Sequence, residues 1–279
     1  MKRFLIADCI LQNEFTSSKG KCVLAVLGFS ALMTIRVVGS MSLTQQKGCM
    51  PYLYPFIPSS ELMRYLVCGS VILLFCNAPF CDKSFPYILI RAGKRQWVKG
   101  VWTYLILASL FLSFVLLGVS VAGLLPHVTF GKAWGDVINK ISLSGYVSGY
   151  GTAILIDEMV IANYKPMEAV FISFLLQTLL FLFLGSIAVC SSLVINQAAG
   201  IIIPVFLVVF SSFTNWALNR TLFCLSPVSW MNINEILGMN SDYYPSLKYI
   251  LLFYILGIII MYAGAYFYVS RKDFSTVTL

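Results

Sequence analysis

The stretch MEAVFISFLLQTLLFLFLGSIAVCS (residues 167–191) decides the fold class of this chain, because it is long, continuous and almost free of charge. A helix needs about 20 apolar residues to cross the hydrocarbon core of a bilayer, which is ~30 Å thick. Backbone amides in lipid must be paired within the protein, and this requirement favours a helix. Outward from this run, five further runs have a similar length, and they are 22–41, 60–80, 99–124, 199–218 and 246–270.

The composition of the whole chain agrees with a membrane protein. Its 279 residues are 59% hydrophobic and only 11% charged, and the mean hydropathy is +0.87. An ordinary soluble domain carries about 25% charged residues. The six runs therefore predict a single all-α polytopic membrane domain over residues 1–279, with six transmembrane helices.

Residues 3–16 are expected to form an amphipathic helix ahead of the first span. Four of its apolar side chains fall within a narrow arc, and they are Phe4, Ala7, Leu11 and Phe15. Glu14 lies near this arc and Leu5 lies well off it, so the pattern is imperfect. Such a helix is expected to lie along the inner membrane interface. The apolar stretch before Asp8 is too short for a signal core, so we expect this segment to stay on the mature protein.

The distribution of charge predicts the orientation, because cytoplasmic segments of membrane proteins are rich in Lys and Arg. With a cytosolic N-terminus, the inner cations are Lys2, Arg3, Lys19, Lys21, Lys83, Arg91, Lys94, Arg95, Lys99, Arg271 and Lys272. The inner anions are fewer, and they are Asp8, Glu14, Asp82 and Asp273. The outer segments balance in charge. We therefore expect a multi-pass protein of a bacterial plasma membrane with both termini in the cytoplasm.

The inner loop between the second and third spans, FCDKSFPYILIRAGKRQWVK (80–99), has a distinct pattern. Ser84 can cap a helix and Pro86 is tolerated in a first turn. Gly93 is a good left-handed stop. The pattern predicts a helix of about two turns over residues 85–92, framed by cations at the membrane surface. Such a helix suits docking to a partner in the cytosol.

The outer side is expected to carry small elements that do not cross the membrane. The long connection 126–166 is expected to form an outer cap, with a short amphipathic helix over residues 134–141. Before the last span, Pro227 can open and Gly238 can close a short helix with the sequence WMNINEIL (230–237). Polar residues inside or beside the spans either bond a neighbouring helix, which we favour, or line a pathway. The pathway candidates are Asn77, Gln177 and Asn215.

Several kinds of chemistry lack their residues in this sequence. His127 is the one histidine, so a histidine-rich zinc site is not expected, and no phosphate-binding loop occurs. We therefore expect no metal, no cofactor and no catalytic residues on this chain, and no nucleic-acid partner because most of it lies in lipid. Cys49 and Cys224 both fall in outer loops, where a bridge between them is possible and two free thiols are the favoured state.

The layout resembles the permease subunit of a type-2 ATP-binding cassette (ABC) transporter, the exporter-like class with six spans in each subunit. The segments that support the resemblance are residues 3–16, SFPYILIRAGKRQW (84–97), AWGDVI (133–138), YKPMEA (164–169) and SPVSWMN (226–232). The resemblance implies that the inner loop carries a coupling helix that fits a groove on a separate ATPase, which holds ATP and Mg²⁺. The implied coupling residues are Phe85, Pro86, Tyr87, Ile88, Arg91, Lys94 and Arg95.

The resemblance also implies a second permease subunit, identical or related, and export of a peptide, drug or lipid of amphipathic or hydrophobic character. Two other classes stay open at this point. One is a stand-alone carrier or membrane enzyme, which the absent histidines, phosphate loop and buried acidic pairs disfavour. The other is a membrane sensor or immunity protein that binds a toxic peptide without moving it.

Overall fold

The computed structural model of the chain describes residues 2–45, 50–78, 91–125, 129, 131, 133–144, 146–149, 152–217, 220–238 and 245–271. These residues are mostly helical. In order, the elements are α1 (Lys2–Thr16), α2 (Ser18–Gln45), the 3₁₀ turn η1 (Tyr54–Ser59), α3 (Glu61–Phe75), α5 (Lys94–Ala122), α6 (Asp136–Ser144), β1 (Tyr146–Gly149), β2 (Thr152–Leu155), α7 (Glu158–Asn163), α8 (Pro166–Val194), α9 (Gln197–Ala217), α10 (Arg220–Cys224), the 3₁₀ turn η2 (Ser229–Met231), α11 (Ile233–Leu237) and α12 (Leu247–Arg271).

Among the described residues, four helices are long and apolar enough to cross a membrane, and they are α5, α8, α9 and α12. They correspond to the predicted runs 99–124, 167–191, 199–218 and 246–270, so the transmembrane helical character is confirmed. The predicted run 22–41 lies within one continuous helix, α2. Within the described part of the run 60–80, which ends at residue 78, the helix is α3, whose 15 residues extend about 22 Å. The prediction of six spans stays a prediction.

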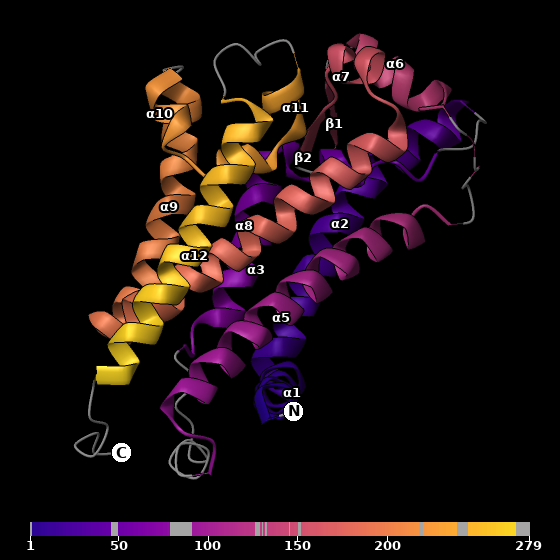
Figure 1. The fold of residues 1–279 in the computed structure, drawn as a ribbon. Helices are drawn as coiled ribbons and strands as arrows, with labels where there is room; N and C mark the ends of the chain where they lie inside the picture. Colours follow the sequence, from indigo (N-terminus) through magenta and orange to yellow (C-terminus); the bar gives the residue numbers. More distant parts are fainter. Residues whose placement is uncertain are drawn as a thin grey trace.

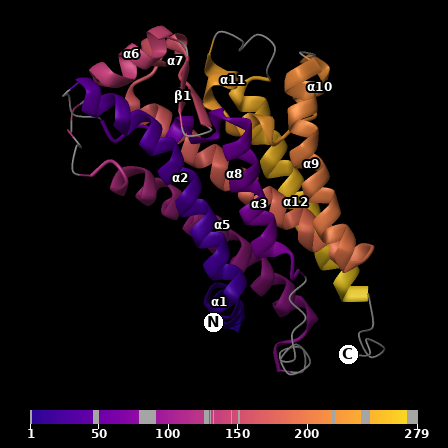
Figure 2. The same ribbon diagram turned by 180° about the vertical axis from the view of Figure 1, so that it is seen from behind.

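The long helices pack around α8, which contacts α3, α5, α9 and α12. Half of the most apolar window of α8 is buried inside the protein, whereas only 17% of the α12 window is. A helix that is apolar on all sides is suited to such a central position, and a peripheral apolar helix is suited to contact with lipid. In Figures 1 and 2 the long helices run side by side between two ends of the molecule.

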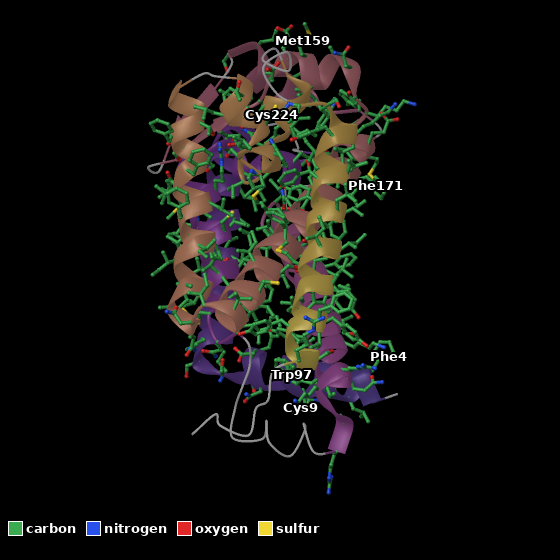
Figure 3. All side chains as sticks on the ribbon, turned by 60° about the vertical axis from the view of Figure 1, so that its left-hand side comes forward. Phe4, Cys9, Trp97, Met159, Phe171 and Cys224 are labelled. Carbon is green, nitrogen blue, oxygen red and sulfur yellow. The ribbon has the colours of Figure 1, made fainter. Side chains whose placement is uncertain are left out.

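The two ends differ in character. One end holds α1, the start of α5 and the last turn of α12, and we call it the basic end; the other holds α6, α7, α11 and the hairpin, and we call it the cap end (Figure 1). Figure 3 shows Phe4, Cys9 and Trp97 at the basic end, with Met159 and Cys224 at the cap end. The N-terminal helix and the described end of α12 therefore lie at the same end of the bundle.

The cap end requires one correction to the all-α prediction. Strands β1 and β2 form an antiparallel pair in which Val147 is opposite Ile154. β-Branched residues favour strands, and the two segments are too short to bury a helix face of their own. Helix α6 (Asp136–Ser144) overlaps the short amphipathic helix that is predicted over residues 134–141, but it starts and ends slightly later in the chain.

The short helix predicted over residues 230–237 is interrupted. The Asn232 side chain accepts a hydrogen bond from the Asn234 amide at 3.2 Å, so α11 starts only after it and η2 precedes it. Trp230 is fully buried against Phe253 and Tyr254 of α12, with ring centroids 5.1 and 5.5 Å away. Its indole N–H donates to the Phe223 carbonyl at 2.8 Å. Residues 229–237, which comprise η2 and α11, are therefore fixed at the cap end, and we call them the plug.

Gly185 allows three helices to approach one another closely. A Cβ at this position would lie 2.9 Å from the Phe75 ring of α3 and 3.0 Å from a Leu105 methyl group of α5. Both of those side chains are buried, so they have little room to move. Small residues at such crossings let helices in a membrane pack tightly.

We therefore predict that Gly185→Val lowers the stability of the purified protein by ~1–3 kcal/mol, because the added methyl groups overpack the α3–α5–α8 crossing. Gly118→Val in α5 is the matched control, since a Cβ at that position meets nothing within 4 Å. Thermal unfolding in detergent measures both variants. Equal midpoints for the two variants would contradict the proposed role of Gly185.

Candidate functional site

A polar contact around the buried Glu14 side chain joins three segments of the chain at the basic end. Glu14 of α1 is only 3% exposed. The Asn77 side-chain amide, just after α3, donates to both Glu14 carboxylate oxygens at 3.1 and 3.2 Å. The Lys19 ammonium of α2 donates to the Asn77 carbonyl oxygen at 2.6 Å. These contacts tie α1 and α2 to the end of α3, immediately before the inner loop.

The same contact sets the rotation of α1. Glu14 faces inward together with Ile6, Ala7 and Ile10, which are all buried. Of the predicted apolar arc, Ala7 is buried in the protein, whereas Phe4 is 54% exposed, so the role of the arc at the membrane interface stays a prediction. A buried carboxylate must keep its hydrogen bonds, since leaving them unmade costs several kcal/mol. The bonds of Glu14 therefore decide which face of α1 turns inward. Glu14, which disturbed the predicted pattern, belongs to the buried face.

The inner loop enters α5 through Gly93, where the backbone reverses. Arg91 and Ala92 are helical, whereas Gly93 has a φ of 81° and a ψ of 156°. That region of backbone conformation is open mainly to glycine, and the helical stretch ends at Ala92 as predicted, but the ψ of Gly93 lies outside the left-handed helical region that was expected. The predicted coupling residues Phe85, Pro86, Tyr87 and Ile88 lie outside the described residues.

Cations gather where α5 begins. Lys94 and Arg95 occupy the first turn of α5, and this turn contains no acidic residue. Cations at a helix N-terminus oppose the helix dipole, so the arrangement favours an anionic group placed nearby. Arg95 is exposed, and its guanidinium carbon lies 6.0 Å from the Tyr266 ring centroid of α12. Arg91 is also exposed at this end.

Polar side chains also lie in the middle of the bundle. Gln177 of α8 is fully buried, and neither its amide nitrogen nor its amide oxygen has a hydrogen-bond partner among the described residues. The neighbouring Thr178 donates to Ser113 of α5 at 2.9 Å, as expected for packing between helices. Asn215 belongs to α9, but its side chain lies outside the described part of the chain. The pathway role of Asn77, Gln177 and Asn215 stays a prediction.

A buried ion pair at the cap end was missed by the sequence reasoning. Arg64 of α3 is 2% exposed, and its Nη2 lies 3.1 Å from Oε1 of Glu235 in α11. Asn232 donates to the same oxygen at 3.1 Å. The available signal was Arg64 inside the mostly apolar run 60–80, one turn beyond the Glu61 at its start, because a charge in such a run needs a partner.

Further hydrogen bonds attach the plug to the cap. The Asn234 side chain donates to the Leu155 carbonyl at 2.7 Å and accepts from the Asp157 amide at 3.3 Å. Tyr54 of η1 is buried nearby in the same core, and burial raises the pKa of its phenol far above the usual value. Polar contacts with α3 and with the segment after β2 therefore hold α11 in place at the cap end.

The described residues include no group of three or more His, Cys, Asp or Glu side chains that could hold a metal ion. Cys224 is a free, half-buried thiol, and its possible partner Cys49 lies outside the described residues. The features that the structure describes at the two ends are charged side chains and hydrogen bonds between elements. Such features suit the binding of another protein and the linking of one helix to the next.

Comparisons of the chain with protein-family models, with curated proteins and with solved structures found no match. The functional assignment therefore depends on the chain's own residues and their geometry.

We predict that Asn77→Leu releases α1 from the bundle, because it leaves the Glu14 carboxylate without its two amide hydrogen bonds. The reporter is a cysteine at Ala7, which is fully buried, introduced into a chain whose native cysteines are replaced. Labelling by a maleimide should be several-fold faster in the Asn77→Leu background than in the parent. A cysteine at Leu5, 63% exposed, is the control and should react rapidly in both. Unchanged protection at position 7 would show that α1 is held by other contacts.

The Arg64–Glu235 pair predicts a strongly non-additive double-mutant cycle. Arg64→Met or Glu235→Leu alone leaves a buried charge without its partner and should cost about 3–5 kcal/mol. The double variant should recover most of that loss, because it removes both charges together. Thermal unfolding of the four proteins in one detergent measures the coupling. Additive losses would mean that the two side chains do not stabilise each other.

Proposed function

We propose that this chain is the non-catalytic membrane subunit of an ABC transporter of the exporter-like type-2 class, driven by a separate ATPase subunit that binds ATP and Mg²⁺. The observation that supports it best is the junction at the basic end. There the cationic first turn of α5 follows Gly93, whose backbone has a positive φ. The hydrogen bonds among Glu14, Asn77 and Lys19, which hold α1, lie at the same end. The basic end is then cytosolic, in keeping with the positive-inside rule.

The junction is well placed to pass force from the inner loop into the bundle. On one side, the loop is attached to α3 close to Asn77, which is bonded to α1. On the other side, it continues through Gly93 into α5, a helix of 29 residues. Both α3 and α5 contact the central helix α8. A displacement of residues 85–92 would therefore act on two long elements at once.

At the cap end, the same helix α3 is attached to the plug. Arg64, near the start of α3, is paired with Glu235 of α11. A shift of α3 along its axis would move or break that pair and disturb the plug that contains Trp230. We infer that the plug closes the outer side of the substrate path in the resting state. The proposed cargo is an amphipathic or hydrophobic peptide, drug or lipid, moved outward between this chain and a second permease subunit of the bacterial plasma membrane.

The test replaces two of the exposed cations at the basic end by acidic residues. In the cells that encode the chain, Arg91→Glu together with Arg95→Glu should reduce co-purification of the ATPase by tenfold or more, since each change turns an attractive contact into a repulsive one. The partner is identified by mass spectrometry through its phosphate-loop sequence. Lys248→Glu is the matched control, because Lys248 is an exposed cation at the start of α12, at the cap end.

Two outcomes would overturn the proposal. The first is the absence of any phosphate-loop ATPase from the purified parent complex. The second is full ATPase recovery and normal ATP-dependent efflux in the Arg91→Glu/Arg95→Glu variant. Peptide binding to the purified chain without ATP-dependent efflux would instead favour a sensing or immunity protein.

A further inference from the structure

A groove lies on the surface of the bundle between α5 and α12, towards the basic end. Its volume is about 490 Å³, within the range of roughly 300–1,000 Å³ that is typical of small-molecule sites. Helix α5 contributes Lys99, Trp102 and Ile106, and α12 contributes Ile258, Ile259 and Tyr262. Both helices are candidate membrane spans, so the groove opens towards hydrocarbon.

The groove has a polar end and an apolar end. Lys99 and Arg95 are four residues apart in α5, so they share one face of the helix at the basic end. Ile106 lies about two turns farther into the membrane, near Ile258 and Ile259. Trp102 packs against Tyr262 between these ends, with ring centroids 5.5 Å apart. An aromatic pair between a cationic rim and an apolar floor is typical of the depth where lipid headgroups meet acyl chains.

Two kinds of polar group at the groove, the cations of its rim and one indole N–H, lack a partner of complementary charge or a hydrogen-bond acceptor within the described residues, whereas Thr103 donates to the Lys99 carbonyl at 2.8 Å. Neither Lys99 nor Arg95 has a described carboxylate within 4.0 Å. Trp102 is 6% exposed, and its indole N–H has no acceptor among the described side chains and backbone. A buried donor normally finds a partner, so its orphan state is an independent indication of a missing acceptor. An anionic oxygen at the rim would complement the charge of Lys99 and Arg95.

We propose that this groove binds one anionic glycerophospholipid of the leaflet at the basic end, with its phosphate on Lys99 and an acyl chain along Ile106, Ile258 and Ile259. A second copy of the chain fits less well. In a two-fold symmetric dimer the same patch meets itself, so Lys99 and Arg95 would face their own like charges. The low burial of α12, 17% of its most apolar window, leaves ample surface for lipid.

The lipid site depends on the membrane placement of α5 and α12 and is independent of the proposed ATPase. The experiment therefore uses the full-length chain alone, purified in detergent and titrated with dioleoyl phosphatidylglycerol or dioleoyl phosphatidylcholine, with bound lipid counted by native mass spectrometry. The parent should prefer the anionic lipid. Lys99→Gln should weaken phosphatidylglycerol binding about fivefold, the effect of one membrane-proximal cation, and leave phosphatidylcholine binding unchanged.

Three further variants make the result specific. Lys99→Arg should retain the preference for phosphatidylglycerol. Ile258→Trp should fill the apolar floor and weaken both lipids. Lys248→Gln removes an exposed cation from the far end of α12 and should change neither lipid. The proposal is overturned if Lys99→Gln binds phosphatidylglycerol as the parent does, or if the groove variants convert a dimer to a monomer without changing lipid binding.

Discussion

The low tolerance of hydrocarbon for unpaired polar groups is the constraint that organises this molecule. An isolated charge or open hydrogen bond inside a bilayer costs several kcal/mol, so charged side chains in particular are paired or lie near the ends. Two polar contacts, each around a buried charged side chain, follow this rule at opposite ends of the bundle. Glu14, Asn77 and Lys19 meet at the basic end, and Arg64 meets Glu235 at the cap end. Helix α3 lies between these contacts and belongs to both.

The short length of α3 makes these end contacts more important. At about 22 Å, the helix is shorter than the ~30 Å core that a spanning helix must cross. The buried 3₁₀ turn η1 precedes it at the cap end, where Phe56 and Ile57 are fully enclosed. The plug around Trp230 covers the same end. Protein therefore replaces lipid around the end of α3, which allows a short helix and a charged Arg64 to be accommodated there.

The sequence was sufficient for the features that depend on local physics. Long apolar runs predicted α5, α8, α9 and α12, and the conformational freedom of glycine predicted the end of a helix at Gly93. The sequence was insufficient where the answer depended on a distant partner. Glu14 seemed a flaw in an amphipathic pattern until Asn77, 63 residues away, was seen to bind it. Arg64 and Glu235 are 171 residues apart, and neither position alone reveals the other. The β1–β2 hairpin was missed because its strands have only four residues each.

The two helices that flank the inner loop are held differently, and in the proposed transporter this difference bears on how force would travel. Helix α3 is fixed by hydrogen-bonded polar side chains near both of its ends, so it can shift only if Glu14 or Glu235 moves with it. Helix α5 begins at a glycine whose backbone lies in a region that other residues avoid, and such a position can act as a hinge. A push on the loop would therefore translate α3 and pivot α5. Because both helices pack on α8, the two motions of the proposed transporter would converge on the helix that carries Gln177, whose amide has no hydrogen-bond partner among the described residues.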